Sequence, residues 1–268
     1  MNTFKTFILD FDTRTDPGLQ LRLEQVDLVL RTSLDMSPEQ TAVGLLDLRT
    51  TRLAMLRPDR EEYAASLAKI GILLAYFELN PGAAEHLDVS IRRELSLMIK
   101  ASSNEMATRF SRELGLTQIQ QVLHSYAFYD PLRGGGLWMG KHYGENSERL
   151  GDPVGHNSHA ATVRQLLRFY LMLEQGRLVS PSASAMMREI FDAPDVPHDD
   201  IKFVRALQGR GVALRRKWGS WEDWKHDSAV VAGPGRHYIL VALTHHACGD
   251  LYLEHFARDV DELLAPGQ

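Results

Sequence analysis

The chain has 268 residues, of which 44% are hydrophobic, and a formal net charge of −5 at pH 7. This length and composition suffice for one large domain, or two tightly packed lobes, with a sizeable core. The negative charge and the lack of long Lys/Arg tracts argue against a nucleic acid or an anionic membrane as a partner, and the single cysteine, Cys248, excludes an internal disulfide.

The N-terminal stretch MNTFKTFILDFD mixes acidic and polar residues into its apolar positions, unlike the apolar core of a signal peptide. The apolar runs IGILLAYF and YILVAL are too short to span a membrane. We therefore expect a cytoplasmic protein that does not contact a membrane.

The first half of the chain combines helices with one predicted hairpin. Apolar residues recur at helical spacing over 19–34, after an Asp-Pro pair that is typical of a helix start. Two apolar runs, 41–48 and 52–56, predict an antiparallel hairpin. A helix over 63–74 and a block of short helices over about 89–123 follow.

The second half begins with segment 125–158, which is rich in Gly, Asp, Pro and Asn and lacks periodicity. It is far longer than an ordinary connection, which indicates a functional or flexible loop. Helices are expected at about 160–175 and 182–191, then three strands, VALRRKW, DSAVVA and HYILVALTH, and a closing helix over 250–264. This order predicts one sheet assembled from both ends of the chain.

A serine and a lysine stand three residues apart, Ser66 and Lys69, at the start of an apolar run. Residues at this spacing share a helix face, so Lys69 can hydrogen-bond to the Ser66 hydroxyl. A partly desolvated lysine can take the proton of a serine and make it nucleophilic. The alternative is a core lysine whose ammonium reaches water, since the pair alone is common by chance.

Two further motifs follow in chain order. The residues SSN at 102–104 lie at a helix break, where a hydroxyl and an amide can project into a cleft. The residues KWGS at 217–220 end a predicted strand, and the glycine would let a substrate approach the backbone closely.

With these three motifs in this order, the sequence resembles the serine β-lactamase and penicillin-binding protein superfamily, most closely its class A β-lactamase-like branch. The resemblance runs over most of the chain and implies one domain over 1–268 of the α/β (α+β) class. That fold is a three-layer αβα sandwich with an antiparallel sheet plus an all-helical lobe. We expect 1–65 and 193–268, with part of 159–192, in the αβα lobe, and 66–158 in the helical lobe and an omega-like loop.

The resemblance also implies catalytic roles. Ser66 would be the acylated nucleophile and Lys69 its proton acceptor or relay. Ser102 would pass a proton to the leaving group. The backbone N–H groups of Ser66 and Ser220 would form an oxyanion hole, which stabilises the tetrahedral intermediate by about 3–4 kcal/mol per donor.

Substrate-binding roles follow from the same resemblance. Asn104 would hold the substrate amide, and Lys217 would attract a substrate carboxylate. Trp218 would line the pocket, beside Gly219 and Ser220.

Several positions depart from the family pattern. Ser103 replaces the usual aspartate and Trp218 the usual threonine, so a hydroxyl that normally meets the substrate carboxylate is missing, although Ser220 could partly replace it. The long loop lacks the Glu-x-x-Leu-Asn pattern that carries the deacylation base. Glu145 and Glu148 are candidates for that base, and His159 is a candidate site neighbour.

Other signals are weaker. GGLWMGK at 135–141 has the spacing of a phosphate loop but is followed by histidine in place of Ser or Thr. The histidines form no zinc pattern, so we expect no metal and no cofactor. Trp221 and Trp224 are interpreted as covering a sheet edge. Strand alternation should turn Arg216 away from its neighbours and leave Lys217 in the groove.

The leading hypothesis from the sequence is a serine hydrolase that forms an acyl-enzyme on a small-molecule ester, amide or β-lactam-like substrate. The alternative is a catalytically retired protein of the same fold that binds a small metabolite or a peptide.

Overall fold

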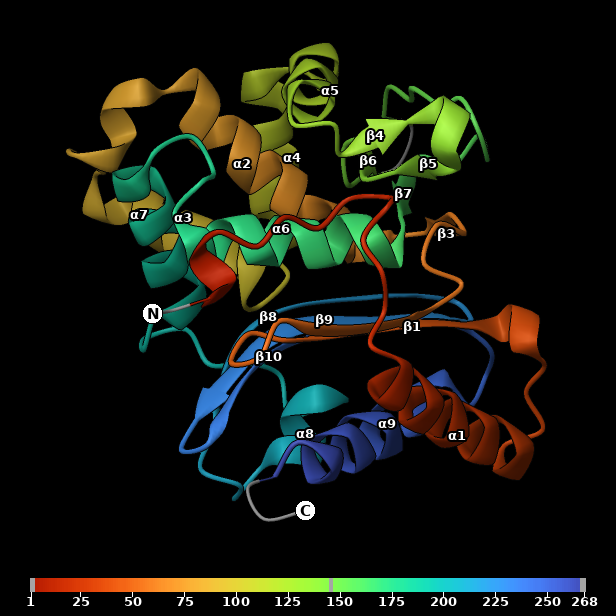
Figure 1. Ribbon diagram of the computed structural model, residues 1–268. Helices are drawn as coiled ribbons and strands as arrows, with labels where there is room; N and C mark the ends of the chain where they lie inside the picture. The colour runs from red at the N-terminus through yellow and green to blue at the C-terminus, as the bar shows by residue number, and fades with distance from the viewer. Residues whose placement is uncertain (1–2, 145–146, 266–268) are drawn as a thin grey trace.

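A five-stranded antiparallel sheet forms the centre of the computed structural model, which describes residues 3–144 and 147–265 (Figure 1). Its strand order is β2-β1-β10-β9-β8, so the first hairpin pairs with the last three strands. The sheet is assembled from both ends of the chain, as the sequence predicts. Its strands are β1 (Thr41–Asp47), β2 (Arg52–Leu56), β8 (Ala213–Trp221), β9 (Trp224–Gly233) and β10 (Arg236–His245).

Helices cover both faces of this sheet and complete a helix-sheet-helix arrangement (Figure 1). The lower face in Figure 1 carries α1 (Pro17–Ser33), α8 (Phe203–Leu207) and α9 (Gly249–Leu263). On the upper face lies α6 (Val163–Gln175), with the other helices around and beyond it. These are α2 (Lys69–Leu79), α3 (Val89–Ile99), α4 (Asn104–Leu114), α5 (Leu116–Ser125) and α7 (Pro181–Asp192).

Short elements connect these layers. The short strands are β3 (Glu62–Tyr63), β4 (Tyr129–Asp130), β5 (Gly135–Gly136), β6 (Trp138–Met139) and β7 (His159–Ala161). The 3-10 helices are η1 (Thr3–Lys5), η2 (Pro38–Gln40), η3 (Ala65–Ala68), η4 (Pro81–Ala84) and η5 (Pro131–Arg133). The sequence patterns predict neither β3 nor α8, because two to five residues are too few to show a period.

Two buried apolar clusters hold the layers together. The cluster that joins the sheet to α1, α8 and α9 includes Leu23, Phe203 and Phe256. The cluster on the opposite face includes Phe110 and Leu167. Full burial of one such side chain stabilises a protein by about 1.5–3 kcal/mol, so the two faces together supply the main driving force for folding.

The sheet and α6 approach each other closely at Gly44 of β1. A Cβ built on Gly44 would lie 2.5 Å from Cγ1 of Val163 and 2.8 Å from Cδ1 of Leu167. A larger residue would push α6 away from the sheet. It would also displace β7, which leads directly into α6. The glycine therefore sets the distance between the sheet and the helical layer.

The described residues of segment 125–158 are held in place by polar side chains that bind their backbone. Asp152 is fully buried and accepts hydrogen bonds from the backbone of Val154 and Asn157 and from the Tyr129 hydroxyl. Glu61 accepts a hydrogen bond from Gly136 N at 3.1 Å. Desolvation, followed by the hydrogen bond to Asp152, raises the pKa of Glu61 to about 8, so the two carboxyl groups can share a proton.

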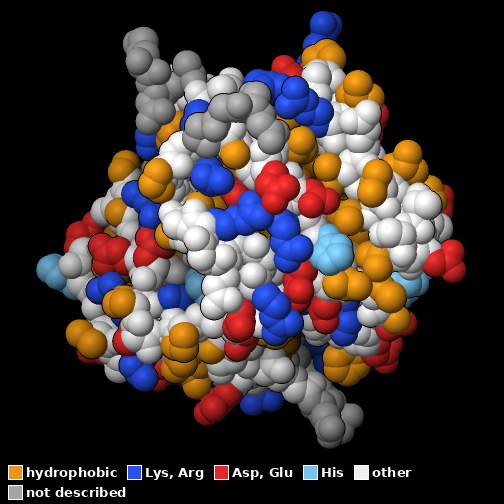
Figure 2. All heavy atoms as spheres, turned by 90° about the horizontal axis from the view of Figure 1, so that it is seen from below, with side chains coloured by type: hydrophobic (Ala, Val, Ile, Leu, Met, Phe, Trp, Pro, Cys, Tyr) orange, Lys and Arg blue, Asp and Glu red, His pale blue; other side chains and the backbone are white. Residues whose placement is uncertain are grey.

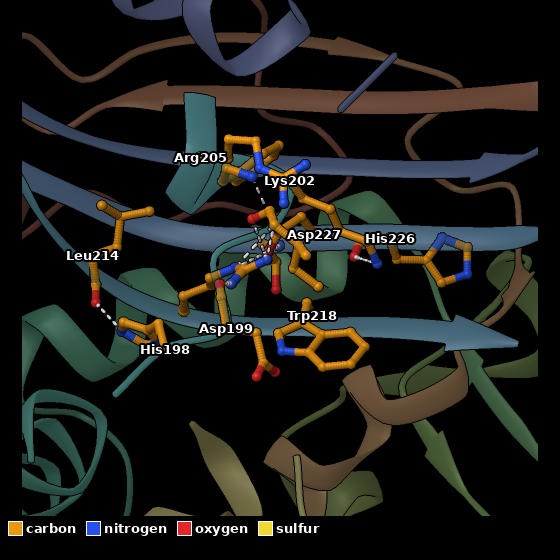
Figure 3. Close-up of polar contacts among 12 residues, drawn as sticks. His198, Asp199, Lys202, Arg205, Leu214, Trp218, His226 and Asp227 are labelled. Atoms are coloured by element: carbon orange, nitrogen blue, oxygen red, sulfur yellow. Dashed lines mark hydrogen bonds and ion pairs between the residues drawn. The ribbon is translucent and has the colours of Figure 1, made fainter. Parts of the chain in front are cut away.

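Arg216 and Asp227 form a buried ion pair between β8 and β9. Both side chains are 0% exposed, and Nη2 lies 2.7 Å from Oδ2. The guanidinium also donates to the carbonyl groups of Asp199 and Ile201, in the polar network drawn in Figure 3. These contacts join the segment before α8 to the edge of the sheet.

The surface seen in Figure 2 mixes Lys and Arg with Asp and Glu over the whole face, with no broad area of one sign. Within 3–144 and 147–265, every helix is too short or too polar to cross a bilayer.

We expect Asp227→Asn to lower the free energy of unfolding by about 3–5 kcal/mol, because it leaves the Arg216 guanidinium buried without its counter-charge. Asp195→Asn is a matched control, since its pair with Arg93 has side chains 53% and 59% exposed. Loss of an exposed pair should cost less than about 1 kcal/mol. Urea unfolding followed by circular dichroism measures both, and equal losses would contradict the expectation.

Candidate active site

Ser66 lies in the 3-10 turn η3, and α2 begins three residues later at Lys69. The edge strand β8 packs directly against this turn. A Cβ built on Gly219 would lie 2.8 Å from Ala64 O and 3.1 Å from Ser66 N. The glycine therefore makes room for the backbone that carries Ser66, whereas the sequence suggested that it makes room for a substrate.

The Ser102 hydroxyl lies between two lysines. Lys69 Nζ is 3.2 Å from Ser102 Oγ, and Lys217 Nζ is 2.9 Å from the same atom. The three residues come from α2, from the turn before α4 and from β8. Tertiary packing thus brings together three residues that the sequence places in three separate motifs.

The other hydrogen bonds of Lys69 differ from the predicted arrangement. Its Nζ donates to Ser102 O at 2.5 Å and to Asn104 Oδ1 at 2.7 Å. In the described parts of the chain, the predicted bond to Ser66 Oγ is not among its contacts. The reason is that Ser66 sits in the tighter η3 turn, while the ammonium is held by the 102–104 turn.

Burial changes the charge of both lysines. Desolvation lowers the pKa of Lys69 to about 7, so a large fraction is neutral at neutral pH. Desolvation, followed by the nearby charge of Lys69, lowers the pKa of Lys217 well below its ordinary value. Among the described residues, no carboxylate forms a salt bridge with either ammonium. The site therefore favours neutral lysine or a bound anion.

The two turns of the site contain strained backbone. Ala65, just before Ser66, has a φ of 47°, and Ser102 has a φ of 55°. A non-glycine residue with a positive φ costs about 1–3 kcal/mol and persists only where its surroundings enforce it.

Ser103 caps α4 by accepting a hydrogen bond from Met106 N, so its side chain stabilises the start of that helix.

Tyr143 covers Lys69, and neither its position nor its role is evident from the sequence. Its ring centre lies 4.4 Å from Lys69 Nζ, and its hydroxyl donates to Ala65 O at 3.0 Å. It stacks on His159, with ring centres 4.6 Å apart. Desolvation raises the pKa of Tyr143 well above its usual range and lowers the pKa of His159 to about 4, so both rings are neutral.

Lys202 is a second unpredicted residue, reaching the site from the segment before α8. Its Nζ donates to Gly219 O at 2.8 Å and to Ser220 Oγ at 2.7 Å, and it lies 4.9 Å from the ring centre of Trp218 (Figure 3). The Ser220 hydroxyl, expected to face a substrate, thus accepts from a buried lysine. Strand pairing places Trp218 opposite Asp227, on the face of β8 that carries Arg216.

A cleft of about 400 Å³ opens beside Ser66. Its walls include Tyr63, Ser66, Asn104, Lys141, His142, Tyr143, Ser158, His159, Ser220 and Trp221. Trp218, predicted to line the pocket, is not among them, and neither are the predicted site residues Lys69, Ser102, Lys217 and Gly219. Trp221, the last residue of the edge strand β8, is 58% exposed and lines the cleft, whereas Trp224 packs on His245 with ring centres 3.8 Å apart.

Of the two candidate deacylation bases, Glu145 and Glu148, the structure describes only Glu148. Glu148 is exposed and is not among the cleft-lining residues. Glu145 lies outside the described residues. Among those that are described, the cleft walls carry no carboxylate, and no group of three or more His, Cys, Asp or Glu could hold a metal ion.

The fold is similar to that of solved beta-lactamases and of PBP-A. A beta-lactamase from Sphaerobacter thermophilus is 14% identical over 92% of this chain and 99% of its own, with a TM-score of 0.70. A mutant of PBP-A, in an acyl-enzyme complex with penicillin G, is 15% identical over 91% and 96%, with a TM-score of 0.70. A variant of the last common ancestor of Gram-negative bacteria beta-lactamase class A is 19% identical over 91% and 98%, with a TM-score of 0.71.

No curated protein matches the chain by sequence. The sequence profile described as "Beta-lactamase enzyme family" matches residues 79–262, more than half of the chain. The matched stretch contains the 102–104 and 217–220 motifs and begins after Ser66 and Lys69. The fold predicted from the motifs is confirmed by the solved structures, and the chain belongs to the beta-lactamase enzyme family.

Proposed function

We propose that this protein is a serine hydrolase that forms an acyl-enzyme at Ser66 on an ester, amide or β-lactam-like substrate. The observation that carries the proposal is the Ser102 hydroxyl between Lys69 and Lys217, next to a turn that presents Ser66 at the cleft. A network of this kind can move a proton from a nucleophile to a leaving group.

In the proposed reaction, neutral Lys69 takes the Ser66 proton as Oγ attacks the substrate carbonyl carbon. The resulting oxyanion is stabilised by the backbone N–H groups of Ser66 and Ser220. When the tetrahedral intermediate collapses, the bond from carbon to the leaving group breaks. The leaving group takes the Ser102 proton, which the protonated Lys69 replaces through its hydrogen bond to Ser102. Asn104, which lines the cleft, orients the substrate, and the buried Lys217 acts through its hydrogen bond to Ser102.

Slow deacylation is part of the proposal. Hydrolysis of an acyl-enzyme needs a base that activates water, and the described cleft walls offer no carboxylate for it. The Tyr143 ring covers Lys69 and is neutral, so it does not supply that base. We therefore expect an acyl-enzyme that forms readily and persists.

The alternative, a retired member that only binds a metabolite or peptide, rests on a different observation. The Lys69 ammonium hydrogen-bonds to the 102–104 turn and not to Ser66 Oγ in the described structure. A protein of this kind would bind a ligand in the cleft equally well with and without the Ser66 hydroxyl.

The first test is covalent labelling with a fluorescent penicillin and with a fluorophosphonate, read by intact and peptide mass spectrometry. We expect one adduct on Ser66 that Ser66→Ala abolishes. Ser182→Ala is the matched control, because Ser182 is exposed and lies outside the cleft walls, so its loss should leave labelling intact. Failure of both probes to label the wild-type protein would favour the binding alternative.

The second test follows the pH dependence of acylation. Only neutral Lys69 can accept a proton, and burial lowers its pKa to about 7, so the rate should rise with pH and level off above about 7. Lys69→Met should remain folded and acylate about 10²–10⁴-fold more slowly, because it keeps the stem and loses the base. Stopped-flow labelling measures both. A folded Lys69→Met protein with wild-type rate and profile would refute this role.

The third test concerns the lifetime of the adduct. We expect the penicillin adduct of the wild-type protein to decay orders of magnitude more slowly than it forms, in time-resolved intact mass spectra. Glu148→Gln should leave this decay unchanged, because Glu148 is exposed and outside the cleft walls. Rapid turnover in the wild type that Glu145→Gln abolishes would instead identify Glu145 as a deacylation base.

A further inference from the structure

A second cavity, of about 510 Å³, lies at the other end of β8 from Gly219. It is bounded by the end of α7, the segment before α8, α8 itself and the first residues of β8. None of its lining residues also lines the cleft beside Ser66. Its volume is within the range of small-molecule sites, about 300–1,000 Å³.

The walls of this cavity are mainly apolar, with Phe191, Val204, Leu207, Val212 and Val230 among them. An apolar lining with a few polar groups is typical of a site that binds a small amphipathic molecule. The polar groups of the lining therefore decide which molecule fits.

Lys100 supplies a buried positive charge. Its side chain is 6% exposed, and its Nζ donates to Ala193 O at 2.5 Å. The lining also contains Asp192 and Arg215, which neutralise each other in a salt bridge, and the Asp195 carboxylate outside it is paired with Arg93. In the described structure, Lys100 has no salt bridge of its own. A buried ammonium that has only a carbonyl partner favours an anionic ligand.

His198 supplies the second polar group. Its Nε2 lies 3.0 Å from Leu214 O, a contact drawn in Figure 3. A carbonyl only accepts hydrogen bonds, so Nε2 carries the proton and Nδ1 holds a lone pair. That Nδ1 atom is buried and has no partner among the described residues. Both Lys100 and His198 line the cavity, and the charge of Lys100 adds to desolvation in lowering the pKa of His198.

We propose that this cavity binds an amphipathic monocarboxylic acid of medium length, with its carboxyl group between Lys100 and His198. The Lys100 ammonium donates to one carboxyl oxygen. Binding takes up one proton from solvent, which is held between the other carboxyl oxygen and His198 Nδ1, so Nδ1 gains a partner and Lys100 gains a second one. The hydrocarbon part covers the apolar walls. The site is separate from Ser66 and does not depend on its chemistry.

Octanoate is the probe, measured by isothermal titration calorimetry, with 1-octanol as the uncharged comparison. We expect saturable one-to-one binding of octanoate, and binding at least about tenfold weaker for octanol, because a hydrogen bond to a charged group contributes about 1.5–3 kcal/mol. Equal affinity for the two compounds, or no saturable binding of octanoate, would overturn the proposal.

Lys100→Met removes the charge and keeps the stem, so octanoate affinity should fall roughly ten- to hundredfold while octanol affinity stays the same. Lys5→Met is the matched control, since Lys5 also donates to a backbone carbonyl, Glu174 O, but is exposed and outside the cavity. Unchanged octanoate affinity in folded Lys100→Met would overturn the proposal.

A photo-reactive diazirine analogue of octanoate locates the site in the wild-type protein without any variant. We expect crosslinks at the lining of this cavity, and the same crosslinks in Ser66→Ala. Crosslinks confined to the cleft beside Ser66, or loss of octanoate binding in Ser66→Ala, would show that the acid occupies the other site and would refute the proposal.

Discussion

The buried pair between Arg216 and Asp227 is the constraint on which the arrangement of the site depends. Neighbouring residues of a strand point to opposite faces, so anchoring Arg216 on one face of β8 directs Lys217 to the other. There Lys217 meets the Ser102 hydroxyl, and Gly219 makes room for the η3 turn. A buried ion pair adds little net stability, but removing one partner is strongly destabilising because the other charge is left buried and unpaired.

The electrostatics of the cleft follow from burial without a counter-charge. Lys69 and Lys217 share one hydroxyl, and both have lowered pKa values because water is excluded from around them. The neutral Tyr143 ring faces Lys69, with its centre 4.4 Å from Nζ, and adds no negative charge there. A neutral lysine can accept a proton for acylation, while the described walls provide no carboxylate to activate water for hydrolysis.

Strand β8 borders two chemically different cavities. Its C-terminal end borders the cleft with Ser66, and its first residues border the cavity with Lys100 and His198. Lys100 stands only two residues before Ser102, at the end of α3, and its ammonium holds the carbonyl of Ala193. Lys100 lines this cavity, and the fully buried Lys69 and Lys217 lie behind the cleft walls. None of the three ammonium groups forms a salt bridge in the described structure, which is the shared basis of the two proposals.

The sequence by itself determined the elements with a clear period or motif: the hairpin β1-β2, the amphipathic helices, the last three strands and the three motifs containing Ser66, Ser102 and Lys217. These depend on local spacing, which a single chain displays. Contacts between distant segments were decided only by the tertiary structure. Tyr143 reaches Lys69 from a loop without periodicity, and Lys202 reaches Ser220 from a segment too short to show a pattern. The hydrogen bonds of Lys69 also depend on how the 102–104 turn packs against α2, because burial and partners arise only when the layers assemble.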